Sequence, residues 1–241
     1  MLPALRSAAT FISIALYVLL VGSPFVLIAI ILGKPAILYR IGHLGVRLGL
    51  LTSGITSTVE GAANIQRHRA AVYAVNHASN VEPPIVFDVL HELFPKLRIL
   101  YKAELHKLPV LGRAFDLAGF VPLERANREQ SLPAIDGAAE ALRDGNSFLI
   151  FPEGTRSRTG NLLPFKKGGF ILAIKGQAPV VPVAITGARD AMRKGSPIIH
   201  PVRVRVRIGE PVETTGMTLD DRDTLATLVH QKVQALLTPP S

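Results

Sequence analysis

Cysteine and tryptophan are both absent from the 241 residues of the chain. Without cysteine the chain can form no disulfide, no thiolate metal site and no cysteine nucleophile, while the compartment stays open. With no tryptophan and 4 tyrosines, it has little aromatic surface on which nucleic-acid bases could stack. Acidic residues are also scarce, with 18 Asp and Glu against 27 Lys and Arg. This excess favours an anionic partner, such as nucleic acid, anionic lipid headgroups or a phosphorylated substrate.

Charged residues are missing from the whole stretch between Arg6 and Lys34. Its most apolar part, residues 11–32, is long enough to cross a bilayer, for which about 20 apolar residues suffice. In the middle, Gly22-Ser23-Pro24 predicts a kink or break, because proline cannot donate to the helix ladder. Two interpretations follow: one kinked span, or two short helices that enter one leaflet as a re-entrant hairpin. A cleaved signal peptide fits less well, because the apolar region of a signal peptide is only about 7–15 residues long and the run in this chain is longer. A buried helix of a soluble fold also ranks behind membrane attachment.

Positive charge follows this apolar stretch, at Lys34, Arg40 and Arg47, whereas Arg6 alone precedes it. Cytoplasmic flanks carry the excess of Lys and Arg, so we expect an inner-membrane protein whose following domain lies on the cytoplasmic side. Residues 39–51 are predicted to form an amphipathic connector, and residues 52–58 a polar turn region. We therefore divide the chain into an N-terminal membrane anchor with connector, residues 1–57, and an α/β domain, residues 58–241.

Short β-rich runs alternate with helical patterns through the second part of the chain. This alternation predicts an α/β domain with a mixed, largely parallel sheet flanked by helices. Strands are predicted over residues 71–75, 98–101, 120–123, 147–151, 180–185 and 202–208. Helices are predicted over residues 84–93, 128–143 and 168–175, and a last one opens with the capping box Thr218-x-x-Asp221 and runs to about residue 237.

An imidazole and a carboxylate follow the first of these strands closely. His77 lies just beyond the strand end, where α/β sheets bind ligands. Glu82 directly precedes Pro83-Pro84, where a helix is expected to begin, and a helix N-terminus favours an ionised carboxylate. Such a carboxylate can fix the tautomer of a histidine that acts as general base. The alternative is a histidine that only hydrogen-bonds its strand end. Ser79 lacks a G-x-S-x-G elbow and is assigned a turn role.

A second polar group follows the predicted strand 147–151. The sequence Phe-Pro-Glu-Gly-Thr-Arg-Ser over residues 151–157 brings together the carboxylate of Glu153, the flexible Gly154, the hydroxyl of Thr155 and the guanidinium of Arg156. Such a turn can hold an anion through charge-assisted hydrogen bonds. Lys166 and Lys167 precede the next helix and add charge at a natural phosphate site. For these two lysines and Arg158, a solvated basic loop is the alternative interpretation.

Four blocks of sequence follow one another in the α/β part of the chain: Asn76-His77 with Glu82, then Gly119 to Arg125, Phe151 to Ser157, and Val181 to Ile185. In this order they resemble the glycerolipid acyltransferase family, and within it the bacterial 1-acyl-sn-glycerol-3-phosphate (lysophosphatidic acid) acyltransferases. The resemblance covers about residues 72–187. The third block is the most specific, and the first departs from the family pattern, which usually has Asp where this chain has Glu82.

The resemblance implies transfer of a fatty acyl group from acyl-CoA or acyl-carrier protein to the sn-2 hydroxyl of 1-acyl-sn-glycerol-3-phosphate, forming phosphatidic acid in phospholipid biosynthesis. It makes His77 the general base and Glu82 its orienting carboxylate. No metal or cofactor is expected beyond the acyl donor, and the expected partners are membrane lipids and that donor, not nucleic acid. The residues implied to bind the acceptor are Lys102, Arg125, Glu153, Gly154, Thr155 and Arg156.

Glu82 leaves two alternatives open. The enzyme could acylate another lysolipid, such as a lyso-ornithine lipid or a lysophospholipid in remodelling. The chain could also be a non-catalytic, membrane-bound lipid-binding relative. We favour a working acyltransferase, because glutamate supplies the same charge as aspartate one methylene further from the backbone.

Overall fold

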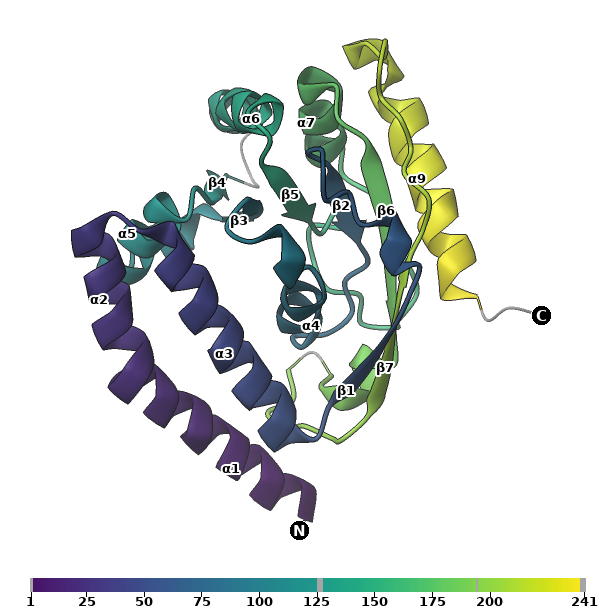
Figure 1. Ribbon diagram of the computed structural model, residues 1–241. Coiled ribbons are helices and arrows are strands. Elements are labelled where there is room, and N and C mark those ends of the chain that lie inside the picture. The colour runs from purple at the N-terminus through teal and green to yellow at the C-terminus, as the bar shows by residue number, and fades with distance from the viewer. Residues whose placement is uncertain (1, 125–127, 194, 239–241) are drawn as a thin grey trace.

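The computed structural model describes residues 2–124, 128–193 and 195–238. Its centre is a seven-stranded sheet in the order β1-β7-β6-β2-β5-β3-β4 (Figure 1). Neighbouring strands run parallel, except that β6 and β7 are antiparallel. The predicted α/β class with a mixed, largely parallel sheet is therefore confirmed. The strands are β1 (Thr56–Glu60), β2 (Val72–Val75), β3 (Leu97–Lys102), β4 (Val121–Leu123), β5 (Ser147–Ile150), β6 (Val180–Thr186) and β7 (Arg203–Ile208).

Successive residues of the central strands face opposite sides of the sheet, as the two-residue period of a strand requires. In β2, Val72 and Ala74 pack into the apolar cluster that the helices α6, α7 and α9 cover. Tyr73 and Val75 pack on the other face, under α4. Because both faces are buried, this strand is apolar without alternation, as in parallel sheets. The helices are α4 (Glu82–Val89), α6 (Arg128–Arg143), α7 (Gly168–Gly176) and α9 (Arg222–Leu237).

The N-terminal apolar stretch forms a long helix that continues through the Gly-Ser-Pro sequence. It comprises α1 (Leu2–Tyr17), a π-helical turn (Val18–Gly22) and α2 (Ser23–Leu32). The span Pro3–Leu32 is the one helix of the described residues that is long and apolar enough to cross a membrane. Of the kink or break predicted at Gly22-Ser23-Pro24, the break does not occur, because a wider turn accommodates the proline: the backbone N–H of Ser23 bonds to the carbonyl of Val18, and its hydroxyl donates to the same carbonyl at 2.9 Å.

The chain reverses direction at Gly33, whose φ of 61° is left-handed, and returns as α3 (Pro35–Ser53). Helices α1 and α3 lie side by side in Figure 1 and form a helical hairpin. Tyr39 of α3 is 2% exposed, lies among the rings of Phe87, Phe94 and Phe120, and donates its hydroxyl to the carbonyl of Leu97. The predicted connector is therefore part of a 19-residue helix that is packed onto the α/β domain.

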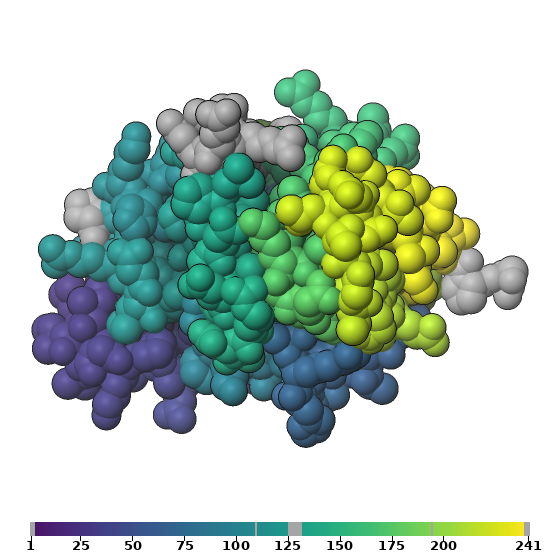
Figure 2. All heavy atoms as spheres, turned by 90° about the horizontal axis from the view of Figure 1, so that it is seen from above, coloured from purple at the N-terminus to yellow at the C-terminus, as the bar shows by residue number. Residues whose placement is uncertain are grey.

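The start of the α/β domain differs from the prediction in one respect. Residues expected in a polar turn region begin the edge strand β1, which pairs with β7 from Thr56 opposite Arg203. The division of the chain after residue 57 stays a prediction. Seen from above, the N-terminal helices lie toward one end of the molecule and α9 toward the other (Figure 2).

Helix boundaries agree with the sequence pattern in most places. The predicted helix 84–93 ends earlier, at Val89, and a short 3-10 turn, His91–Leu93, follows. The capping box of Thr218 and Asp221 is present and leads into α9 through a 3-10 turn. The two segments directly after β3 had no counterpart in the prediction: the 3-10 segment η4 (Ala103–Lys107) and α5 (Pro109–Leu117).

Candidate active site

The candidate site lies at the carboxyl ends of three adjacent strands, β6, β2 and β5. Asn76 follows β2, and its side chain is bonded to the backbone of Ile185 in β6. The amide oxygen accepts the Ile185 N–H at 2.7 Å, and the amide nitrogen donates to the Ile185 carbonyl at 3.1 Å. This pair of bonds ties the first block to the fourth and fixes the direction in which the chain leaves the sheet toward His77.

The predicted pair of imidazole and carboxylate is assembled. Nδ1 of His77 lies 2.9 Å from Oε2 of Glu82, and the same oxygen accepts the backbone N–H of Ala78 at 2.7 Å. Glu82 is 1% exposed and stands in the first turn of α4. With Nδ1 as the donor in this contact, the lone pair of Nε2 is left to accept a proton.

The third block holds the backbone of His77 from both sides. Oε1 of Glu153 accepts the His77 N–H at 2.5 Å, and the N–H of Ser157 donates to the His77 carbonyl at 2.7 Å. The imidazole also lies against the ring of Phe151, with 4.5 Å between centroids. Through these three contacts, the third block, which follows β5, positions both the backbone and the ring of His77.

Glu153 points into the protein, in contrast to its predicted contact with substrate. Its side chain is 3% exposed, and its second oxygen accepts the N–H of Leu163 at 2.9 Å. Burial raises the pKa of Glu153, and the charge of nearby Glu82 acts in the same direction, against the two N–H donors that lower it. The buried carboxylate thus joins the backbone of His77 to the loop before α7 through two hydrogen bonds and so acts as a clamp.

The predicted anion-binding residues gather around the same turn. Arg156 donates to the side-chain oxygen of Asn80. Gly154 has a φ of +67°, and the side chain of Lys166 passes within 2.8 Å of the point that a Cβ at residue 154 would occupy. Thr155 is exposed in this turn. Lys166 therefore packs over the third block. The sequence alone did not distinguish this contact from a solvated basic loop.

Two further predicted residues are less informative. Lys102 ends β3, is 55% exposed and pairs with Glu104 at 2.8 Å. Arg125 lies outside the described residues.

Ser79 donates its hydroxyl to the carbonyl of Met192 at 2.7 Å and accepts the N–H of Val81 at 3.4 Å, as its turn role predicts.

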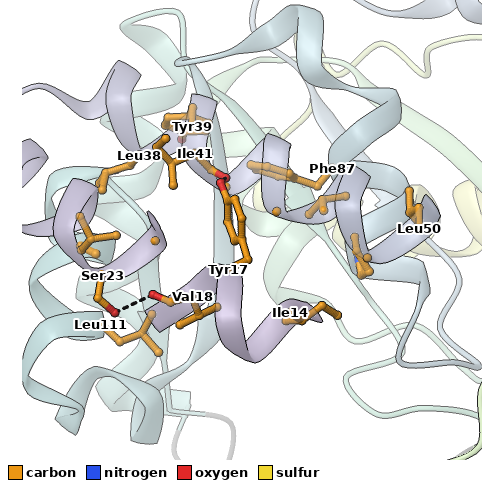
Figure 3. Close-up of a pocket in the computed structure, with 18 of the residues that line it drawn as sticks. Ile14, Tyr17, Val18, Ser23, Leu38, Tyr39, Ile41, Leu50, Phe87 and Leu111 are labelled. Atoms are coloured by element: carbon orange, nitrogen blue, oxygen red, sulfur yellow. Dashed lines mark hydrogen bonds between the residues drawn. The ribbon is translucent and has the colours of Figure 1, made fainter. Parts of the chain in front are cut away.

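A large apolar cavity adjoins the site, with a volume of about 710 Å³. Its wall comes from α1, α2, α3, α4 and α5 and includes Asn80 and Val81 of the loop that carries His77. In Figure 3 the ring of Tyr17 stands across the cavity, and its hydroxyl donates to the carbonyl of Ile41 at 2.6 Å. No local pattern in the sequence indicates this cavity as a whole, because five separate helices build it. One partial signal was present: Gly42, Gly45 and Gly49 lie on one face of α3 and line the wall. Gly45 and Gly49 let the side chains of Tyr17 and Ile14 approach α3 closely.

A second cavity, of about 540 Å³, touches Asn76 and Glu82 and has a mostly polar lining. Thr159, Asn161 and Gln234 on its wall can form hydrogen bonds with a polar ligand. Within the described ranges, no group of three or more His, Asp or Glu side chains is arranged to hold a metal ion.

Comparison with known proteins identifies the class. The model of the Acyltransferase family matches residues 56–186, more than half of the chain and all four blocks. The chain belongs to the Acyltransferase family, and the resemblance found in the sequence is confirmed.

Individual relatives refine this result. The chain is 34% identical to a 1-acyl-sn-glycerol-3-phosphate acyltransferase of Limnanthes douglasii over 78% of this chain and 66% of the relative. It is 31% identical to the alpha form from Mus musculus over 75% and 63%. The crystal structure of the 1-acyl-sn-glycerophosphate (LPA) acyltransferase PlsC from Thermotoga maritima matches with a TM-score of 0.80 and 25% identity, covering 98% of this chain and 95% of that one. The chain spans just under two thirds of the length of the Limnanthes relative.

Proposed function

We propose that the protein transfers a fatty acyl group from a thioester to the sn-2 hydroxyl of 1-acyl-sn-glycerol-3-phosphate, forming phosphatidic acid. The observation that carries the proposal is the contact of 2.9 Å between His77 and a buried Glu82 at the carboxyl end of the central strand. The names of the relatives, at 34% and 31% identity, support the same substrate class.

In the proposed reaction His77 is the general base. Its Nε2 takes the proton of the acceptor hydroxyl as the hydroxyl oxygen attacks the thioester carbonyl carbon. Glu82 holds the ring through Nδ1 and stabilises the imidazolium that forms. When the C–S bond breaks, His77 returns the proton to the leaving thiolate. A C–O bond has then replaced a C–S bond, the thiol leaves, and no acyl-enzyme is required.

The apolar cavity is the proposed site of an acyl chain. It adjoins the loop of His77 at Asn80 and Val81, so a chain inside it can keep its carbonyl end near the imidazole. Burial of acyl chains is worth about 0.8 kcal/mol per CH₂, and the N-terminal helices that line the cavity are also the proposed membrane anchor. Attachment at the inner membrane with the α/β domain on the cytoplasmic side is part of the proposal, supported by Lys34, Arg40 and Arg47 after the apolar helix.

The acceptor phosphate is proposed to lie at the third block, near Arg156 and Lys166. The close passage of Lys166 over Gly154 supports this assignment, and Lys102 and Arg125 are the further candidates. Lys167 offers a matched control, because it is the next residue but pairs with Asp223 at 2.5 Å. We expect Lys166→Met to raise the KM for lysophosphatidate about tenfold or more, as loss of a charge-assisted contact of roughly 1.5–3 kcal/mol implies, while Lys167→Met leaves it near wild type.

The direct test of the reaction compares purified wild type with His77→Ala in vesicles that contain lysophosphatidate. Loss of a general base lowers turnover by about 10²–10⁴-fold. Unchanged turnover in His77→Ala would rule out the proposed mechanism. Running the assay with acyl-CoA and with acyl-carrier protein identifies the donor.

Another lysolipid acceptor is the second candidate, motivated by Glu82 at the position where the family usually has Asp. A panel of lysophosphatidate, lysophosphatidylethanolamine and lyso-ornithine lipid separates the two, because the proposed phosphate site predicts the highest kcat/KM for lysophosphatidate. Wild-type protein that binds lysolipid but turns over no thioester would instead support the non-catalytic alternative.

A further inference from the structure

Four large apolar side chains are exposed together on the segment 105–111, which covers the end of η4 and the start of α5. Leu105, Leu108, Val110 and Leu111 are 42%, 50%, 48% and 37% exposed. The other large apolar residues exposed after residue 57 in the described part of the chain are scattered singly at Val59, Leu132, Leu219 and Leu228. A grouped apolar surface of this kind marks an interaction site, whereas isolated residues are ordinary.

The 105–111 segment continues the apolar surface of the N-terminal helix. Helix α5 contacts α2, and the two lie next to each other in Figures 1 and 2. In Figure 3 Leu111 lies near Val18, and both residues line the apolar cavity. Because Val18, Val110 and Leu111 are also exposed, the cavity reaches the molecular surface between these helices.

The polar side chains of this region are mainly basic. Lys107 and Arg113 are exposed, and none of the ion pairs found among the described residues involves them. The neighbouring acids have partners: Glu104 pairs with Lys102, and Asp116 lies 3.6 Å from His106. The segment therefore combines apolar side chains with net positive charge, which is the chemistry of a protein surface that binds anionic lipid.

We infer that the 105–111 segment inserts into the interface of an anionic phospholipid bilayer beside the N-terminal helix. This inference rests on the membrane attachment in the proposed function and extends it to the acyltransferase domain itself. A second copy of the chain fits less well, because a symmetric dimer would bring this patch against itself and oppose its cations. With both helices in lipid, an acyl chain enters the cavity sideways from the bilayer without crossing water.

The absence of tryptophan from the chain permits a direct test. Full-length Leu108→Trp, reconstituted in phosphatidylethanolamine and phosphatidylglycerol vesicles, carries a single tryptophan whose quenching by brominated acyl chains reports contact with lipid. Leu20→Trp on the N-terminal helix, where Leu20 is 67% exposed, is the positive control. Leu228→Trp on α9, where the leucine is 38% exposed, is the matched negative control.

We expect brominated lipid to quench Leu108→Trp nearly as strongly as Leu20→Trp and to leave Leu228→Trp unquenched. Quenching of Leu20→Trp alone would overturn the inference and leave the anchor intact. Quenching of neither would overturn the membrane attachment as well. Emission of Leu108→Trp that ignores brominated lipid but shifts on addition of acyl-carrier protein would identify the segment as a docking site for an acidic carrier, and the inference would be wrong.

Turnover gives an independent readout with residues that do not line the cavity. The double variant Leu105→Ser with Leu108→Ser should lose turnover of a long-chain acceptor held in vesicles and keep that of a short-chain, water-soluble lysophosphatidate. Retained turnover of the soluble acceptor demonstrates that the variant is folded. Leu219→Ser with Leu228→Ser is the control pair, and equal turnover of vesicle-held acceptor in both double variants contradicts the inference.

Discussion

One oxygen of Glu82 accepts two N–H groups, from the His77 ring and from the Ala78 backbone. The orientation of the imidazole and the path of the loop therefore depend on the same atom. Aspartate at this position would keep the charge but withdraw it by about one C–C bond, roughly 1.5 Å. The backbone must then approach more closely for both bonds to survive.

We expect Glu82→Asp to keep part of the activity and Glu82→Gln to lose more of it. The amide of glutamine preserves shape but not charge, so it no longer stabilises the imidazolium, and a loss of about 10²-fold or more in kcat is expected. Steady-state kinetics with lysophosphatidate measures both. A glutamine variant as active as the aspartate variant would mean that shape, not charge, is what His77 needs.

Glu153 predicts a pH dependence of stability. An unfolded glutamate loses its proton near the ordinary pKa of 4.5, whereas burial raises the pKa of Glu153 in the folded protein. Between these values the folded state binds more protons than the unfolded state, so the free energy of unfolding falls as pH rises. Glu153→Gln does not titrate and removes this dependence.

The measurement is the difference in free energy of unfolding between wild type and Glu153→Gln, taken by denaturant unfolding in detergent from pH 4.5 upward. The stability of wild type relative to the variant should decline with rising pH and then level off. A relative stability that grows with pH would indicate that the pKa of Glu153 is lowered, contrary to the effect of burial.

At the residue scale, the sequence predicted what is local. His77 and Glu82 are five residues apart, and the proline pair directly after Glu82 marks the helix start. The contact from Glu153 to the His77 backbone joins residues 76 positions apart. Since only the adjacency of β2 and β5 brings them together, the role of Glu153 as a clamp could not be predicted.

At the scale of elements, helix α3 forms part of the wall of the apolar cavity. Gly42 lines this cavity, and a Cβ there would make only an ordinary contact, 3.8 Å from the ring of Phe87. A larger side chain can therefore be accepted at residue 42 and extend into the space proposed for the acyl chain.

We expect Gly42→Met to shift acyl preference toward shorter chains. Each CH₂ displaced from the cavity costs about 0.8 kcal/mol, about a fourfold loss in kcat/KM. A series of acyl-CoA donors and acceptors of increasing length measures the shift. Gly137→Met in α6, where a Cβ meets nothing within 4 Å, is the control. An unchanged preference in Gly42→Met would place the acyl chain elsewhere.

The central strands, buried on both faces, were predicted well, and the edge strand β1 was not. The central strands are continuous apolar runs, so their pattern is visible locally. Edge strand β1 is mostly exposed and owes its pairing to β7, which begins at Arg203, so its polar sequence suggested a turn. The long N-terminal helix continued through Pro24 because a π turn removes the clash, an adjustment that composition does not specify.

At the scale of the whole molecule, Tyr39 joins the helical hairpin to the α/β domain. Its hydroxyl donates to the carbonyl of Leu97 and lies 3.3 Å from the carbonyl oxygen of Ala118. Both carbonyls belong to the α/β domain. The hairpin and the sheet are therefore coupled through a buried hydrogen bond as well as through packed rings.

We expect Tyr39→Phe to lower the free energy of unfolding by about 1–3 kcal/mol, because it keeps the ring but leaves buried carbonyls without a donor. Denaturant unfolding in detergent measures the loss. Tyr17→Phe is the matched control, since its hydroxyl bonds within the hairpin at Ile41 in a partly exposed place. Equal losses in the two variants would mean that Tyr39 does not couple the two parts.

The hydrogen bonds that hold His77 in place also restrict how the reaction can be stabilised. The N–H groups of His77 and Ala78 already donate to Glu153 and Glu82. Neither amide is available to the oxygen that becomes negative when, in the proposed reaction, the hydroxyl attacks the thioester. The donors for that charge must therefore be other groups of the protein or groups of the substrates, so the two amides that position the base do not also stabilise the oxyanion.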